Sequence, residues 1–314
     1  MMKFIPILFL FFSNFLFAAG FCTDYENVAE DTITYAAAGG IPDNLEDCEF
    51  APDGYEVTIY KFGMCTQAPT APTGAAAMDT TNCITIFESD AGTAFNLAVG
   101  VELDLAGEEK PANGTYTHAY VIMANTFGIT HSQRFGGAPA TMGGVAGGNG
   151  AVCISSANDA AIGDDTTQYH ASNEQTLAAL GQDYVTCGAA PGTAEKITEV
   201  LDTFGCDDPT DKTTCDFTAQ APTANGQMDA YLTKEAGTLV SDNVLSDQNN
   251  DADRLVARLA WTTPVVITDT TSEADIQFTV NRGTSARLYP PGNGTPFDIF
   301  SFGSGPFSVN IVVQ

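Results

Sequence analysis

Short segments in which apolar residues recur at every second position constrain the fold of this chain more than any other feature of its sequence. Residues 55–59 and 255–261 show the pattern most clearly. A period of two is that of a β-strand with one buried face. Weaker segments of this kind, or short apolar runs, occupy residues 83–87, 95–105, 115–124, 229–234, 237–241, 264–268, 276–280, 297–302 and 307–313.

About ten short strands separated by turns predict a mainly β protein, an antiparallel β-sandwich of the Ig-like or jelly-roll type. We expect a first strand group in residues 55–133 and a second group in residues 228–314 that completes the same sandwich. Residues 134–227, glycine-rich at their start and holding four cysteines, form an insertion between the groups. Two small separate domains are the alternative.

The insertion contains the only segments with a helical pattern, residues 174–180 and 194–204. In the second, Ile197, Val200, Leu201 and Phe204 recur at helical spacing behind Thr193, a residue type suited to a helix N-cap. The insertion is therefore predicted to be small, loop-rich and partly helical.

The first twenty residues read as an export signal. Lys3 precedes an almost wholly apolar run, residues 4–17, and the small residues Ala18, Ala19 and Gly20 follow it. A membrane-spanning helix needs about 20 apolar residues, so this run is too short for an anchor. The sequence predicts a signal peptide at residues 1–20, no membrane span after its cleavage, and a secreted or cell-surface protein of the bacterial outer surface or periplasm.

Eight cysteines follow the predicted signal, and an even number in an exported chain indicates disulfides. Their grouping favours pairs of neighbours, one of which ties down an N-terminal segment at residues 21–54. Zinc is the alternative, but the chain has no Cys-x-x-Cys pair. The expected pairs are Cys22 with Cys48, Cys65 with Cys83, Cys153 with Cys187, and Cys206 with Cys215.

The charge balance narrows the possible partners. The chain has 39 acidic and 11 basic residues, for a formal net charge of −28. Nucleic-acid binding depends on clustered Lys and Arg, so nucleic acid is excluded as a partner. Cations remain compatible with this composition.

No motif for catalysis emerges, and no catalytic residue is predicted. A nucleophile elbow needs Gly-x-Ser-x-Gly, a spacing that the stretch around Ser304 lacks. The histidines, His118, His131 and His170, are isolated in sequence and are interpreted as surface or packing residues. Trp261 is expected to point into the core because it continues an alternating strand.

One acidic segment is a candidate cation site. Asp247, Asn249, Asp251 and Asp253 lie two residues apart, which resembles the start of an EF-hand calcium loop. The sequence then departs from that loop, because the glycine and the terminal glutamate that it requires are missing. An irregular calcium site and a solvated acidic turn stay open, and calcium is the only cofactor that the sequence suggests.

These features together predict an exported structural or adhesive cell-surface protein, a subunit of a fimbria-like or surface-layer assembly, rather than an enzyme. Its partners would be copies of itself or other surface proteins. The first alternative is a carbohydrate- or ligand-binding module, calcium-dependent or not, in which Tyr116, His118 and Tyr120 would line a concavity that holds a glycan. The second alternative is a secreted hydrolase with an unrecognised site.

Overall fold

The computed structural model describes residues 46–97, 102–103, 110–134, 152–156, 185–188, 190, 192–201, 204, 216–223, 225–240, 252–272, 274–289, 298–305 and 307–313. The predicted signal peptide, the glycine-rich start of the insertion and the predicted helix at 174–180 lie outside these residues. So do most positions of the predicted calcium site.

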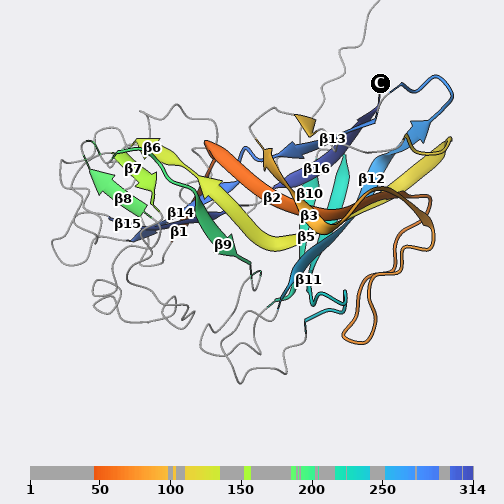
Figure 1. The fold of residues 1–314 in the computed structure, drawn as a ribbon, viewed down its shortest axis with the longest axis horizontal. Helices are drawn as coiled ribbons and strands as arrows, with labels where there is room; N and C mark the ends of the chain where they lie inside the picture. The colour runs from red at the N-terminus through yellow and green to blue at the C-terminus, as the bar shows by residue number, and fades with distance from the viewer. Residues whose placement is uncertain are drawn as a thin grey trace, which may run out of the picture.

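The described residues form sixteen β-strands and no α-helix, which confirms the mainly β class (Figure 1). All strand pairs are antiparallel. The largest sheet runs in the order β10 (Thr218–Thr223), β11 (Gly226–Thr233), β12 (Arg254–Ile267), β5 (Gly114–Thr130), β2 (Gly54–Cys65) and β3 (Cys83–Leu97), with β9 (Ile197–Val200) also paired to β5.

Three smaller sheets accompany this large sheet, each of three strands. Their orders are β1 (Glu46–Phe50), β14 (Thr284–Tyr289), β15 (Asp298–Ser304); β16 (Ser308–Val313), β13 (Ala274–Thr279), β4 (Glu102–Leu103); and β6 (Ser132–Arg134), β7 (Val152–Ser155), β8 (Val185–Gly188). In Figure 1 the sheets of β1 and of β6 gather at one end of the molecule, and β15 contacts β8 there.

The core lies against one face of the large sheet. Ala230, Ala257, Val121 and Phe62 are register partners on β11, β12, β5 and β2, and all four are buried. This row repeats along the strands because side chains alternate between faces with a period of two. Strand β16 packs against β10 and β12, with Val309 buried.

The clearest alternating segments form the strands that they predict. Tyr55, Val57 and Ile59 are buried along β2, while the intervening residues are partly exposed. Trp261 is buried on β12, as expected. Pro264 lies where the register of β12 against β5 shifts, between Ala260 and Val265.

The helix predicted at residues 194–204 is wrong, because the chain forms strand β9 there and pairs with β5. β-Branched residues at 197, 198 and 200 favour a strand over a helix, and Ile197 is buried while Val200 is exposed. The described part of the insertion, β7 to β10, is therefore β-structure rather than helix. Within the described residues no element is a helix long and apolar enough to cross a membrane.

Candidate functional site

The face of the large sheet opposite the core carries a line of polar register partners. Gln220, Asp229, Arg258, Tyr120 and Gly63 lie on β10, β11, β12, β5 and β2 in turn, each opposite the next. We call this line the Arg258 row. It brings an ion pair and an aromatic ring together on this face, and it is the candidate site.

An ion pair lies at the centre of the Arg258 row. The Arg258 Nε donates to Asp229 Oδ2 at 2.8 Å, and both side chains are more than two thirds buried. Burial raises the pKa of Asp229, but hydrogen bonds from Arg258, Gln227 and Gln220 outweigh it, so the net pKa lies below the usual value. The carboxylate is thus held ionised by three donors.

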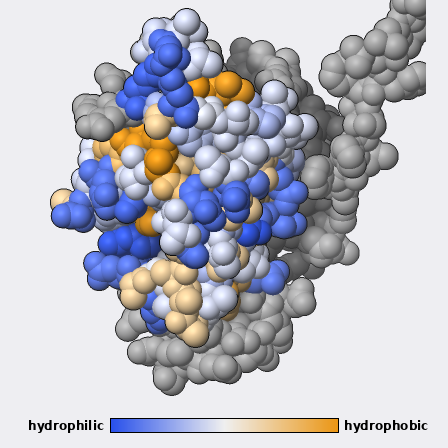
Figure 2. Space-filling model, turned by 90° about the vertical axis from the view of Figure 1, so that its right-hand side faces the viewer, coloured by the Kyte–Doolittle hydropathy of each residue, from blue (hydrophilic) through white to orange (hydrophobic). Residues whose placement is uncertain are grey.

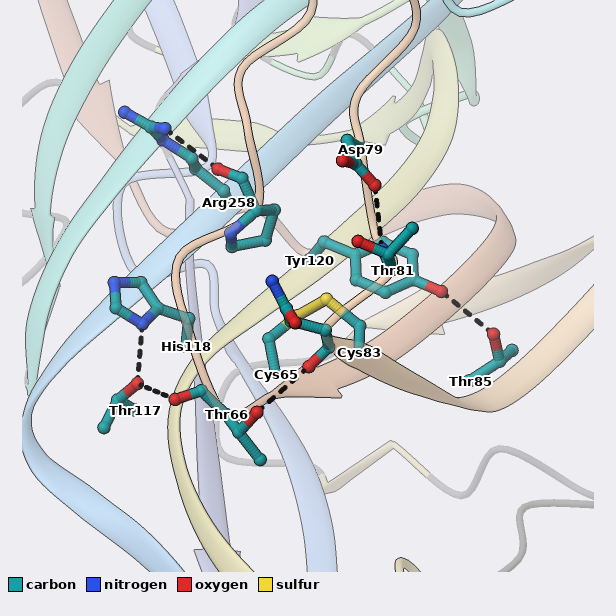
Figure 3. Close-up of a disulfide and its surroundings, with 12 residues drawn as sticks. Cys65, Thr66, Asp79, Thr81, Cys83, Thr85, Thr117, His118, Tyr120 and Arg258 are labelled. Atoms are coloured by element: carbon teal, nitrogen blue, oxygen red, sulfur yellow. Dashed lines mark hydrogen bonds between the residues drawn. A yellow bond between two sulfur atoms is a disulfide. The ribbon is translucent and has the colours of Figure 1, made fainter.

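A loop closed by a disulfide lies over this row. Cys65 and Cys83 are register partners on β2 and β3, and their bond closes residues 66–82, here called the 66–82 loop (Figure 3). Within the loop, backbone bridges join Thr70 to Asp79 and Thr73 to Ala76. The disulfide therefore fixes a short folded hairpin and not an open tether.

Two hydrogen bonds fix the 66–82 loop onto the large sheet, and a third joins it to the segment that follows β11. Arg258 Nη1 donates to the Pro69 carbonyl at 3.1 Å, and Thr117 Oγ1 donates to the Thr66 carbonyl at 3.1 Å. Further along, the Leu239 N–H donates to the Thr73 carbonyl at 2.9 Å. Arg258 is thus shared between the sheet and the loop, as Figure 3 shows.

His118 lies beside this cluster with a defined tautomer. Its Nδ1 is 2.8 Å from Thr117 Oγ1, whose single proton is already donated to Thr66. The hydroxyl therefore accepts from Nδ1–H, which leaves the lone pair on Nε2. Burial, helped by the charge of Arg258, lowers the pKa of His118, so the ring is neutral at pH 7.

The tyrosines near His118 do not form an exposed stacking surface. Tyr116 and Tyr120 are both buried, and their hydroxyls contact the Ala112 carbonyl and Thr85 Oγ1. The Tyr120 ring lies against Gly63, where an added Cβ would clash with the ring. The concavity expected for a glycan-binding module is therefore not lined by these rings.

His131 is buried among aromatic rings. Its ring stacks on Phe50 at 5.6 Å between centroids and meets Phe302 edge-on at 5.1 Å. Its backbone N–H donates to Ser155 Oγ, whose hydroxyl donates to the Glu195 carbonyl. Burial lowers the pKa of His131 to about 4, and it outweighs the opposite effect of the nearby Gln133.

The structure reaches only one residue of the predicted calcium site. Asp253 is exposed, and its Oδ2 accepts a hydrogen bond from the Glu235 N–H. Asp247, Asn249 and Asp251 lie outside the described residues, so the calcium site stays a prediction. In the part of the chain that the structure describes, no three His, Cys, Asp or Glu side chains gather around a common point.

One predicted disulfide, Cys65–Cys83, is confirmed. Cys153 is also disulfide-bonded, and the backbone register of β7 and β8 places residue 187 directly opposite it. Cys48 lies on β1, which is the only structured part of the N-terminal segment described. The remaining pairs, Cys22–Cys48 and Cys206–Cys215, stay predictions because Cys22, Cys206 and Cys215 lie outside the described residues.

Asp229 and Arg258 are not among the site residues that the sequence predicts, although the sequence carries a signal for Arg258. The chain has only 11 basic residues, and Arg258 interrupts the most apolar alternating strand of all. A charge at such a position requires a partner across the sheet, which the register supplies as Asp229.

No family model matches this chain, and no curated protein or solved structure is significantly similar to it.

Proposed function

We propose that this protein is an exported structural or adhesive component of the cell surface, a subunit of a fimbria-like or surface-layer assembly. The observation that supports it best is how the ionisable groups of the candidate site are used. Arg258 and Asp229 bind each other, neighbouring amides and the 66–82 loop. They hold the fold together, which is the use expected in a structural protein.

The arrangement of sheets is part of this proposal. Strand β16 packs against β10 and β12, and Phe278 and Val309 belong to the same buried cluster as residues of the large sheet. We take this as a sandwich of two antiparallel sheets, with the strand groups of residues 55–133 and 228–314 both contributing. Many extracellular structural modules have such an architecture.

Two properties of the sequence add support. The predicted signal peptide accounts for export, and disulfides persist only in oxidising compartments. Confirmation of the Cys65–Cys83 bond fits a protein outside the cytoplasm. The glycan-binding alternative has less support, because Tyr116 and Tyr120 are buried.

Labelling of intact cells tests the proposal. An antibody against the mature chain should stain unpermeabilised cells, and N-terminal sequencing of the native protein should begin near residue 21. Native material should sediment as an assembly that contains this chain. Staining only after permeabilisation, together with an uncleaved N-terminus, would reject it.

A further inference from the structure

Strand β16 forms an edge of its sheet. The order is β16, β13, β4, and in the described part of the chain β16 pairs with β13 alone. All six residues of β16 pair with β13 without a register shift. A regular strand at an edge presents a row of backbone N–H and C=O groups on its outer side.

The other sheet edges of comparable length carry features that discourage pairing. Strand β1 contains three acidic residues, and strand β15 begins at the charged Asp298 and pairs with β14 through a register shift. Strand β10 contains Pro222, which lacks an N–H. Strand β3 contains the charged Glu88 and a register irregularity beside Gly92, whose φ is +75°. Strand β16 has neither proline, nor charge, nor bulge. Proteins commonly use such features to prevent pairing at sheet edges. Strand β16 lacks them, so its edge is open to pairing with another strand.

Charge also favours contact at this place. The chain has a net charge of −28, so two copies repel each other over most surfaces. No charged residue follows Asp298, and β16 lies within this neutral segment. The side chains of two paired β16 strands therefore bring no like charges together.

The strand is also held extended before any partner arrives. Val309 is buried, and β16 packs against β10 and β12 of the large sheet. Binding to a preformed strand avoids the entropy loss of ordering a loose segment. Antiparallel pairing of one edge with its own copy is self-complementary, which is what a two-fold dimer requires.

We propose that two copies of this chain pair through their β16 edges, antiparallel and about a two-fold axis. The pairing joins two three-stranded sheets into one continuous six-stranded sheet. The inference rests on the proposed function, since it names the contact by which subunits meet, but its test uses purified protein and is independent of cellular location.

Charge variants at Asn310 provide the test, because this residue lies mid-strand and out of phase with the buried Val309. Sedimentation of the mature wild type over increasing concentration should show a monomer–dimer equilibrium. Asn310→Asp and Asn310→Lys should each weaken self-association by about fivefold or more, because each places like charges near the two-fold axis. Mixing the two variants in equal amounts should restore dimers.

Two further measurements complete the design. Amide hydrogen exchange in β16 of the wild type should slow as concentration rises, which requires no variant and decides the matter even if both variants fail to fold. Ser272→Asp and Ser272→Lys, at an exposed position outside the strand, are the matched controls and should leave the equilibrium unchanged. A wild type that stays monomeric, or variant mixtures that dimerise no better than each variant alone, would overturn the inference. Binding of β16 to a different surface protein instead would also overturn it.

Discussion

Arg258 connects three parts of the molecule at the scale of a single residue. It pairs with Asp229 on β11, holds the loop through Pro69, and lies over the Tyr231 ring at 5.8 Å. A lysine at this position would keep the charge but could not donate in two fixed directions at once.

Replacement of Arg258 should therefore destabilise the fold. We expect Arg258→Met to lower the free energy of unfolding by about 2 kcal/mol, because Asp229 and the Pro69 carbonyl lose a charged donor. Arg258→Lys should recover part of the loss. The measurement is urea unfolding followed by circular dichroism.

The matched control is Lys196→Met, which breaks the exposed ion pair with Glu56. Exposed ion pairs contribute little to stability, so this change should lower the free energy of unfolding by less than about 1 kcal/mol. An equal loss of unfolding free energy in both variants would show that the ion pair in the Arg258 row stabilises the fold no more than an exposed pair does.

His131 should make stability depend on pH. Its pKa is about 4 in the folded protein and about 6.5 in the unfolded chain, so the unfolded chain takes up a proton first as pH falls. The neutral His131 ring contributes fully to the free energy of unfolding above pH 6.5. This contribution is lost progressively as the pH falls toward 4, where the loss reaches about 3 kcal/mol.

This loss can be isolated with His131→Phe, which keeps an aromatic ring between Phe50 and Phe302. Unfolding free energies are compared at about pH 7 and about pH 4.5 for wild type and variant. The wild type should lose more stability than the variant, since the many carboxylates contribute equally to both. An identical pH dependence in the two proteins would contradict this explanation.

At the scale of elements, the 66–82 loop depends on the Cys65–Cys83 bond. A disulfide that closes a loop of this length contributes about 3 kcal/mol, mainly by restricting the unfolded chain. The double variant Cys65→Ser, Cys83→Ser should lower stability by about that amount. Amide exchange at Thr70 and Thr73, which bond within the loop, should also become faster.

The control for this prediction is an amide in the centre of the large sheet, such as Val121. Its exchange should change only as far as global stability changes. Exchange that accelerates equally at Val121 and Thr73 would show that the disulfide stabilises the whole molecule without holding the loop in particular.

The sequence predicts strands well where one face of the strand is buried, and less well in other segments. Residues 55–59 form a strand as expected, because a strand with one buried face has apolar residues at every second position of its sequence. The helix predicted at residues 194–204 is wrong, since the spacing of Ile197 and Val200 fits a helix as well as a strand. Pairing with β5 decides its structure, and a tertiary contact of that kind leaves no local signal.

The candidate site was less predictable than the fold. Asp229 and Arg258 are 29 residues apart in sequence, and only the β11–β12 register brings them together. The contact between Arg258 and Pro69 spans 189 residues. Spacing rules detect neighbours along the chain, so neither contact could be found from the sequence alone.

At the scale of the whole molecule, acidity is the dominant property. The net charge of −28 adds repulsion that folding must overcome, and bound cations would reduce it. Figure 2 shows hydrophilic and hydrophobic residues interspersed over the face that it views, rather than one continuous apolar surface. Nonspecific association through that face is therefore not favoured.

The effect of calcium on stability should distinguish a specific calcium site from general screening of the negative charge. If Asp247, Asn249, Asp251 and Asp253 bind calcium, a hundredfold excess over Kd should stabilise the fold by about 2.7 kcal/mol. The rise in melting temperature with calcium should be larger in the wild type than in Asp251→Ala. Magnesium at equal ionic strength is the control, and an equal rise in both proteins would indicate diffuse screening.

The covalent closure of the 66–82 loop also determines how the molecule responds to damage. Most residues of the loop are exposed, and Asp79 offers an aspartate-specific protease an accessible cut. Such a nick divides the polypeptide into two pieces, yet Cys65–Cys83 keeps them in one molecule, with β2 and β3 still paired. Nicked protein would migrate at full length in electrophoresis without reductant and separate only with it. In surroundings that contain foreign proteases, the loop can be cut while both pieces stay in one molecule.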